Sequence, residues 1–261
     1  MSFILLFLYA PIFVLIIFSF NSSRSRTVWT GFSLEWYRRL FTDGTILDAF
    51  YTTLVIAALA AVIATVAGTI AAVGFYSMRN KWRTPLTQIN NIPMMNADIV
   101  TGVSLSLLFV SLGTALQFRL GFGTLLIAHI VFCIPYVVLA IMPKLRQIDR
   151  NLVDAACDLG CTWMQAFWKV IIPEIRPGII NGLIIAFTLS IDDFVISYFT
   201  AGGNIMTLPM QIFAMTRRRI SPEINALSTI LFLSVLAMLI IINVRNVRQE
   251  EKLKRRNTAL N

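Results

Sequence analysis

Two adjacent carboxylates stand inside a long apolar run of the sequence. Asp192 and Asp193 are the only charged residues between positions 179 and 200. A carboxylate at the centre of a membrane helix costs at least about 2.5 kcal/mol on insertion scales, so two together require a reason. Their negative charge can attract a cation in a solute path. Alternatively, a carboxylate can pair with arginine or cap a broken helix, and the nearby Ser190 and Ser197 are consistent with a local irregularity.

Three further side chains could contact a cationic solute. Asp98 stands where the apolar run from 99 to 116 begins, so a helix N-cap is the favoured role and substrate contact the alternative. Tyr9 and Tyr198 could attract ammonium groups through the faces of their rings. If Asp192, Asp193 or Asp98 faces the solute path, the solute is expected to be a cation. This expectation disfavours sulfate, phosphate and molybdate as solutes.

Motifs of the common catalytic centres are missing from the sequence. It contains no Gly-x4-Gly-Lys-Ser/Thr phosphate cradle, no Gly-x-Ser-x-Gly elbow and no His-Glu-x-x-His. The single histidine, His129, is interpreted as a hydrogen-bonded interior residue rather than a proton relay. Cys157 and Cys161 have helical spacing, but we interpret them as small buried side chains rather than metal or redox ligands. We expect no catalytic residue, no metal site and no cofactor.

The composition is that of a membrane protein. Of 261 residues, 57% are hydrophobic and 13% are charged, about half the charge of a soluble domain. A helix needs about 20 apolar residues to cross a bilayer. Because the apolar runs are continuous rather than alternating, they are predicted to be helices of a single all-α transmembrane domain over residues 1–261. The six predicted spans are 3–20, 52–76, 99–116, 124–142, 179–200 and 224–243.

The basic residues predict the orientation of the chain. The chain has a net charge of +9, and its basic residues lie between the apolar runs. This placement favours anionic membrane lipid as a partner and disfavours nucleic acid. The loops on one side contain fourteen Lys and Arg, and those on the other contain eight. The positive-inside rule therefore places both termini, the loop 144–178 and the basic tail 244–261 in the cytoplasm.

The second span contains small residues at four-residue steps. Such stripes let membrane helices approach closely, although an alanine-rich span has them by chance equally well. In either case we expect this span to lie inside a bundle. The stripes consist of Ala60, Ala64, Gly68 and Ala72, and of Ala57 and Ala61.

The loop 144–178 is predicted to be structured, because about 35 residues exceed a simple connection between packed helices. Asp149 offers an N-cap, and apolar residues recur at three- and four-residue steps from 151 to 169. Gly160 interrupts this pattern, which predicts two short helices that meet at a turn. An amphipathic helix on the bilayer surface is the alternative interpretation.

This loop resembles the cytoplasmic signature of bacterial ATP-binding-cassette importer permeases. The matching strings are Asp154-Ala155-Ala156, Gly160 and Val170-Ile171-Ile172-Pro173. They keep the spacing of Glu-Ala-Ala, Gly and Ile-x-Leu-Pro in that family, with three mild replacements, and Asp154 shortens the acidic arm by one methylene. In the family the loop forms coupling helices seated in a groove of an ATPase subunit. The resemblance implies this coupling role for Asp154, Ala155, Ala156, Gly160 and Pro173.

Shorter strings elsewhere are similar to the C-type permease subunits of spermidine/putrescine importers. They are Tyr9-Ala10-Pro11, Phe20-Asn21-Ser22-Ser23, Trp36-Tyr37, Asp98-Ile99-Val100-Thr101-Gly102, Ser190-Ile191-Asp192-Asp193 and the string from 221 to 227. The resemblance implies the type I importer permease fold in the bacterial inner membrane. It also implies a heterodimer with a related permease, two copies of an ATPase that binds the ATP, and an extracytoplasmic polyamine-binding protein.

Three functions remain open at this point. A permease subunit of a polyamine importer is the leading hypothesis, and the same scaffold with a different solute is the second. An ATP-independent secondary transporter or channel comes third, because secondary transporters usually show internal repeats with paired broken helices, and the sequence has no convincing repeat.

Overall fold

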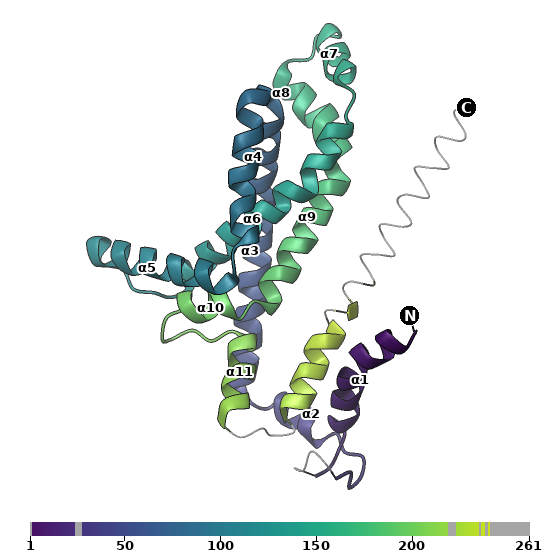
Figure 1. The fold of residues 1–261 in the computed structure, drawn as a ribbon, viewed down its shortest axis with the longest axis vertical. Helices are drawn as coiled ribbons and strands as arrows, with labels where there is room; N and C mark the ends of the chain where they lie inside the picture. The colour runs from purple at the N-terminus through teal and green to yellow at the C-terminus, as the bar shows by residue number, and fades with distance from the viewer. Residues whose placement is uncertain (1, 24–27, 219–222, 235, 238–239, 241–261) are drawn as a thin grey trace. The chain divides into compact units, whose positions relative to one another are not determined.

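The computed structural model describes residues 2–23, 28–218, 223–234, 236–237 and 240 (Figure 1). These residues are helical almost throughout, as predicted, with an isolated antiparallel bridge between Asn21 and Phe32. The chain forms two compact units, which comprise residues 1–48 with 211–261, and residues 49–210. The predicted basic tail at 244–261 lies outside the described residues.

The first unit contains α1 (Ser2–Phe18), α2 (Glu35–Leu40) and an apolar helix over Glu223–Ser234. The buried Asn21 organises the segment that follows α1. Its side chain donates to the carbonyl of Val28 at 2.8 Å and accepts from the backbone N–H of Thr30 at 3.0 Å. Trp36 Nε1 donates to the Asn21 carbonyl at 2.6 Å, which ties this segment to α2.

Helices long and apolar enough to cross a membrane agree with four of the predicted spans. They are α3 (Gly44–Ser77), α5 (Asp98–Leu116), α6 (Phe122–Gln147) and the continuous helical stretch Trp163–Asp192, which ends in α9 (Ile172–Asp192). Shorter apolar helices cover Tyr9–Phe18 and Glu223–Ser234, within or near the first and last predicted spans. Both shorter helices belong to the first unit, as does the start of α3.

Helix α4 (Asn80–Met95) was not predicted. It contains Pro85 and Pro93 and has no buried residue. Hydropathy patterns reveal helices through their apolar residues, and α4 is rich in amide, hydroxyl and basic side chains instead. A polar helix next to apolar spans therefore gives no signal in such a pattern.

The core of the second unit lies along α6 and α9. Val137, Ile141, Leu145 and Ile175 are fully buried there. The small residues of the second span are buried as well, which confirms that this part of α3 is interior. Their side chains are at most 1% exposed at Ala57, Ala60, Ala61, Ala64 and Ala72.

The predicted span 179–200 is interrupted, in agreement with the alternative that a carboxylate there caps a broken helix. Helix α9 ends at Asp192, and a new helix, α10 (Val195–Thr200), starts after Phe194. Asp193 has extended backbone angles of φ −64° and ψ 121°. The break arises because the Asp193 side chain supplies acceptors for the backbone at the start of α10, and an apolar pattern does not record this competition.

The loop 144–178 contains helix ends and short helices, as predicted. After α6 come α7 (Arg150–Asp158), α8 (Trp163–Ala166) and the π-helical turn η1 (Phe167–Ile171). Asp149 caps α7 by accepting from the backbone N–H of Asn151 at 3.0 Å. Gly160 has φ +86°, a left-handed conformation that side chains with a Cβ rarely adopt. This glycine therefore permits the turn between α7 and α8.

Candidate functional site

Asp193 lies in the break between α9 and α10 and bonds to the start of α10. Its side chain is only 7% exposed. Oδ2 accepts from the backbone N–H of Ser197 at 2.8 Å and from the Ser197 hydroxyl at 3.0 Å, and Oδ1 accepts from the Ile196 N–H at 3.3 Å. The first N–H groups of a helix lack intrahelical partners. The geometry at Asp193 is therefore that of a carboxylate that caps a broken helix.

His129 of α6 joins the two sides of this break. The imidazole is 2% exposed. Nδ1 lies 2.6 Å from the hydroxyl of Ser190 in α9, and Nε2 lies 3.0 Å from the hydroxyl of Ser197 in α10. His129 is thus a hydrogen-bonded interior residue, as predicted. Its two serine partners are 61 and 68 residues away in sequence, so the pairing was not predictable from local pattern.

Asp192 has a different environment from its neighbour. It is the last residue of α9, and it is exposed. Among the residues that the structure describes, its carboxylate forms no ion pair. Of the two adjacent acids, Asp192 is therefore the one whose negative charge is available to a cation.

Asp98 begins α5, and the predicted N-cap role is wrong. Ala97 is the N-cap residue, it has no side-chain hydrogen bond, and Asp98 is an exposed residue of the first turn. Gly102, one turn further along α5, packs against α10. A Cβ on Gly102 would lie 3.1 Å from the Phe199 ring and 3.4 Å from the Cα of Ile196. The tertiary structure therefore brings two of the family-like strings, at 98–102 and 190–193, to the same helix break.

The two candidate tyrosines are both exposed. Tyr198 of α10 lies in an aromatic group, with its ring centroid 5.5 Å from those of Phe194 and Phe199. Tyr9 lies in α1 of the other unit, and half of its surface is exposed. Both side chains are accessible to a cation, which aromatic rings attract.

Helix α7 presents an uncovered apolar surface. Leu152, Ala155 and Leu159 are exposed, and the exposed fraction of Leu159 reaches 87%. Val153 and Ala156, on an adjacent face of the helix, are partly buried. These positions follow helical spacing, so one face of α7 packs against this chain and the other is open to a partner.

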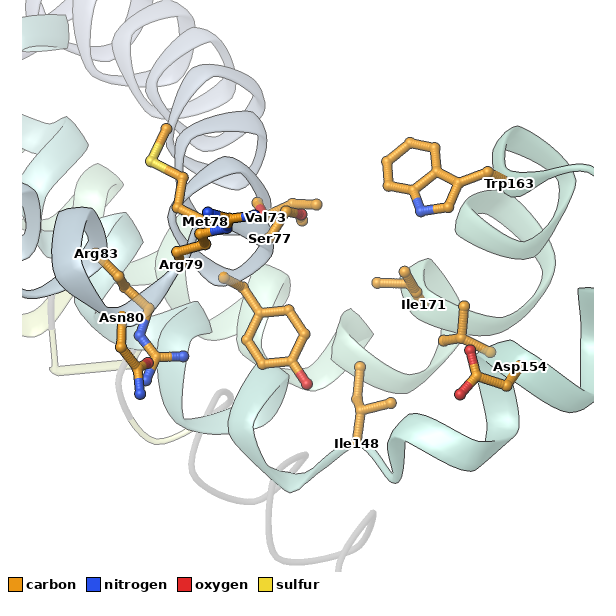
Figure 2. Close-up of a pocket in the computed structure, with 12 residues that line it drawn as sticks. Val73, Ser77, Met78, Arg79, Asn80, Arg83, Ile148, Asp154, Trp163 and Ile171 are labelled. Carbon is orange, nitrogen blue, oxygen red and sulfur yellow. Dashed lines mark hydrogen bonds between the residues drawn. The ribbon is translucent and has the colours of Figure 1, made fainter.

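The other residues of the predicted coupling motif have different environments. Asp154 is exposed and lines a pocket of about 680 Å³ (Figure 2). Pro173 is the second residue of α9, directly after the π-helical turn η1. Gly160 occupies open space, with no atom within 4 Å of an added Cβ. The Asp154 pocket was not predicted, because its other walls come from the α3–α4 corner.

The cysteines do not match the sequence prediction. Cys157 is exposed in α7 and Cys161 is partly exposed, so the interpretation of this pair as buried side chains is wrong, whereas Cys133 is buried. Among the described residues there is no group of three or more His, Cys, Asp or Glu that could hold a metal ion.

Comparisons with known proteins agree with this architecture. A family model described as "Binding-protein-dependent transport system inner membrane component" matches residues 64–255. The putrescine transport system permease protein PotI of Escherichia coli (strain K12) is 43% identical over 232 residues, which are 86% of this chain and 81% of that protein. The spermidine/putrescine transport system permease protein PotC of Haemophilus influenzae is 38% identical over 235 residues, 90% of each chain.

Solved structures share the fold at low sequence identity. A chain of a bacterial ABC transporter involved in the import of the acidic polysaccharide alginate matches with a TM-score of 0.70 at 16% identity, covering 96% of this chain and 92% of that chain. A chain of the inward-facing MetNI methionine ABC transporter matches with a TM-score of 0.63 at 20% identity, covering 78% and 95%. With most of the chain matched by the family model and by relatives of 38–43% identity, the protein belongs to the family of binding-protein-dependent transport system inner membrane components.

Proposed function

We propose that this chain is the permease subunit of an ATP-driven importer that moves putrescine or spermidine from an extracytoplasmic binding protein into the cytoplasm. The observation that carries the proposal is the identity of 43% to the putrescine permease PotI, over 86% of this chain. A spermidine/putrescine permease of similar length is 38% identical across 90% of the chain.

The acidic break between α9 and α10 supports a cationic solute. Asp193 is bonded to its own chain, and the exposed Asp192 carries a charge without an ion-pair partner among the described residues. In a partly dehydrated path, the attraction between this carboxylate and an ammonium group is several times stronger than in bulk water. We assign solute contact to Asp192 first. Asp98 and the Tyr198 ring are further candidates, and Tyr9 of the other unit is a separate candidate.

Helix α7 is the proposed docking element for a separate ATPase. Its exposed Leu152, Ala155 and Leu159 form an apolar strip of the kind that a partner groove covers. The sequence has no phosphate-binding loop, so the energy of ATP must enter through this contact. We propose two ATPase copies and a second, related permease, with Asp154, Ala156, Gly160 and Pro173 supporting the contact on this side.

The proposed topology is a single domain with six membrane spans and both termini in the cytoplasm. The count of fourteen basic residues against eight supports this orientation. It places α7 on the side where ATP is available. It also places the loop between α1 and α2 on the outer side, where a binding protein delivers the solute.

Transport by the reconstituted complex tests the proposed function. The assembled transporter is placed in liposomes with ATP inside and the binding protein outside, and uptake of labelled putrescine, spermidine, arginine and sulfate is measured. We expect ATP-dependent uptake of at least one polyamine and none of sulfate. Uptake of another solute with no polyamine uptake would assign the scaffold to that solute, and polyamine uptake without ATP would show a secondary transporter.

A further inference from the structure

The pocket beside Asp154 has walls of opposite charge. One wall is formed by the corner between α3 and α4, with Arg79, Asn80 and Arg83 (Figure 2). The opposite wall carries Asp154 of α7 and Trp163 of α8, and Tyr76 is a further lining residue. All of these residues belong to the second unit. The pocket therefore offers cationic donors on one side, and a carboxylate with aromatic faces on the other.

These charges are not paired within the described part of the chain. Neither Arg79 nor Arg83 forms an ion pair there, and Asp154 forms none. Arg79 is also the N-cap residue of the sixteen-residue helix α4, which has no side-chain cap bond and no acidic residue in its first turn. The free N–H groups and the positive end of the helix dipole add to the two guanidinium groups. This wall is suited to a phosphate.

In the proposed topology, the pocket lies near the cytoplasmic surface of the membrane. The apolar helix α3 ends at Ser77, one of the pocket residues, and Met78 and Arg79 follow directly. Trp82 of α4 and Trp168 of η1 are also exposed. Tryptophan concentrates at the headgroup region of bilayers, and basic pockets there bind lipid headgroups. Val73, Val153 and Ile171 supply apolar lining for the remainder of such a molecule.

We propose that this pocket binds the phosphoethanolamine headgroup of an aminophospholipid. The phosphate lies against Arg79, Arg83 and the start of α4, and the ammonium lies between Asp154, Tyr76 and Trp163. The two arginines repel a free polyamine, so the pocket is separate from the transport path. The single carboxylate disfavours a headgroup that has a phosphate and no ammonium. Because the lipid joins α7 to the α3–α4 corner, it sets the position of the coupling segment.

Lipid binding to the delipidated, assembled transporter tests the proposal. Native mass spectrometry counts bound phosphatidylethanolamine, phosphatidylglycerol and phosphatidylcholine, and soluble phosphoethanolamine is added as a competitor. We expect phosphatidylethanolamine to bind at least tenfold more tightly than phosphatidylglycerol, which has no ammonium. The double variant Arg79→Gln/Arg83→Gln should lose this binding at least tenfold, and Arg79→Lys/Arg83→Lys should retain most of it.

The charge-specific variant is Asp154→Asn. It should weaken the binding of phosphatidylethanolamine, because the ammonium loses its carboxylate partner. It should strengthen the binding of phosphatidylglycerol, because a negative charge near the anionic lipid is removed. The control Arg146→Gln, an exposed basic residue of α6 outside the pocket, should change neither. Equal binding of phosphatidylethanolamine by wild type and the double glutamine variant would overturn the proposal. The proposal would also fail if wild type bound phosphatidylglycerol more tightly than phosphatidylethanolamine. Binding that appears only after the ATPase is removed would assign the pocket to the ATPase, and full competition by soluble phosphoethanolamine would assign it to a soluble zwitterion.

Discussion

His129 Nε2 lies 3.5 Å from Asp193 Oδ2, and the Ser197 hydroxyl bonds to both groups. Because Ser197 donates its proton to the carboxylate, it accepts one from Nε2, and Nδ1 bonds to the Ser190 hydroxyl on the other side of the ring. This arrangement uses both ring nitrogens. It holds α6, α9 and α10 together at the helix break.

Replacement of His129 by alanine is expected to destabilise the break. Two buried hydroxyl contacts are lost and the Asp193 carboxylate loses a neighbour, at a cost of about 1–3 kcal/mol in unfolding free energy. The thermal midpoint and the yield of the detergent-extracted complex should both fall. Thr188→Ala on α9 is the control, since the Thr188 hydroxyl donates to the Ile184 carbonyl of its own helix. A His129→Ala complex as stable as the Thr188→Ala complex would contradict this role.

The two adjacent acids are expected to respond differently to the same change. Asp193→Asn weakens the cap on α10, which is worth about 1 kcal/mol, and should lower the yield of folded complex. Asp192→Asn leaves these bonds intact and should strongly reduce polyamine uptake at normal membrane abundance. Uptake, extracted yield and binding-protein-stimulated ATPase activity are measured for both variants. Normal uptake by Asp192→Asn would remove this residue from the solute path.

The contact of α5 with α10 is expected to tolerate no large side chain at Gly102. A Cβ there already meets the Phe199 ring at 3.1 Å, and overpacking of this kind costs about 1–3 kcal/mol. Gly102→Leu should lower the thermal midpoint of the complex. Gly74→Leu in α3 serves as the control, because nothing lies within 4 Å of its Cβ position. Equal midpoints for the two leucine variants would show that the helices do not approach at Gly102.

Gly160 is expected to matter for coupling rather than for folding. Its φ of +86° costs a residue with a Cβ about 1–2 kcal/mol, and asparagine tolerates this region better than alanine. The space around it is empty, so Gly160→Trp should leave the permease abundant while obstructing the ATPase. Uptake should persist in Gly160→Asn and be lost in Gly160→Trp. Wild-type uptake by Gly160→Trp would exclude this docking site.

The exposed Cys157 reports the side of the membrane on which α7 lies. A membrane-impermeant maleimide should label it in inside-out vesicles and leave it unmodified in intact cells, because the proposed topology places α7 in the cytoplasm. Cys157→Ser/Cys161→Ser is the background for Thr42→Cys, an exposed position of the first unit that should be labelled in intact cells. The reverse pattern would invert the topology and separate α7 from any cytoplasmic ATPase.

The sequence by itself determined the class of the fold and most of its helices. A continuous apolar run in lipid is expected to form a helix, because a helix satisfies all of its backbone hydrogen bonds within the segment. The Asp149 cap and the Gly160 turn were also predictable, since both depend on the backbone within a few residues. Helix α4 was missed because its polar residues carry no apolar period.

The tertiary structure decided the roles of the acidic residues. Asp192 and Asp193 are equivalent in a hydropathy pattern, yet one is exposed and the other is bonded to α10 and close to His129. The charged pocket likewise combines Arg79 and Arg83 with Asp154, more than 70 residues away along the chain. A carboxylate accepts from whichever donors the packing of separate helices brings within about 3 Å, and that distance is a property of the folded chain.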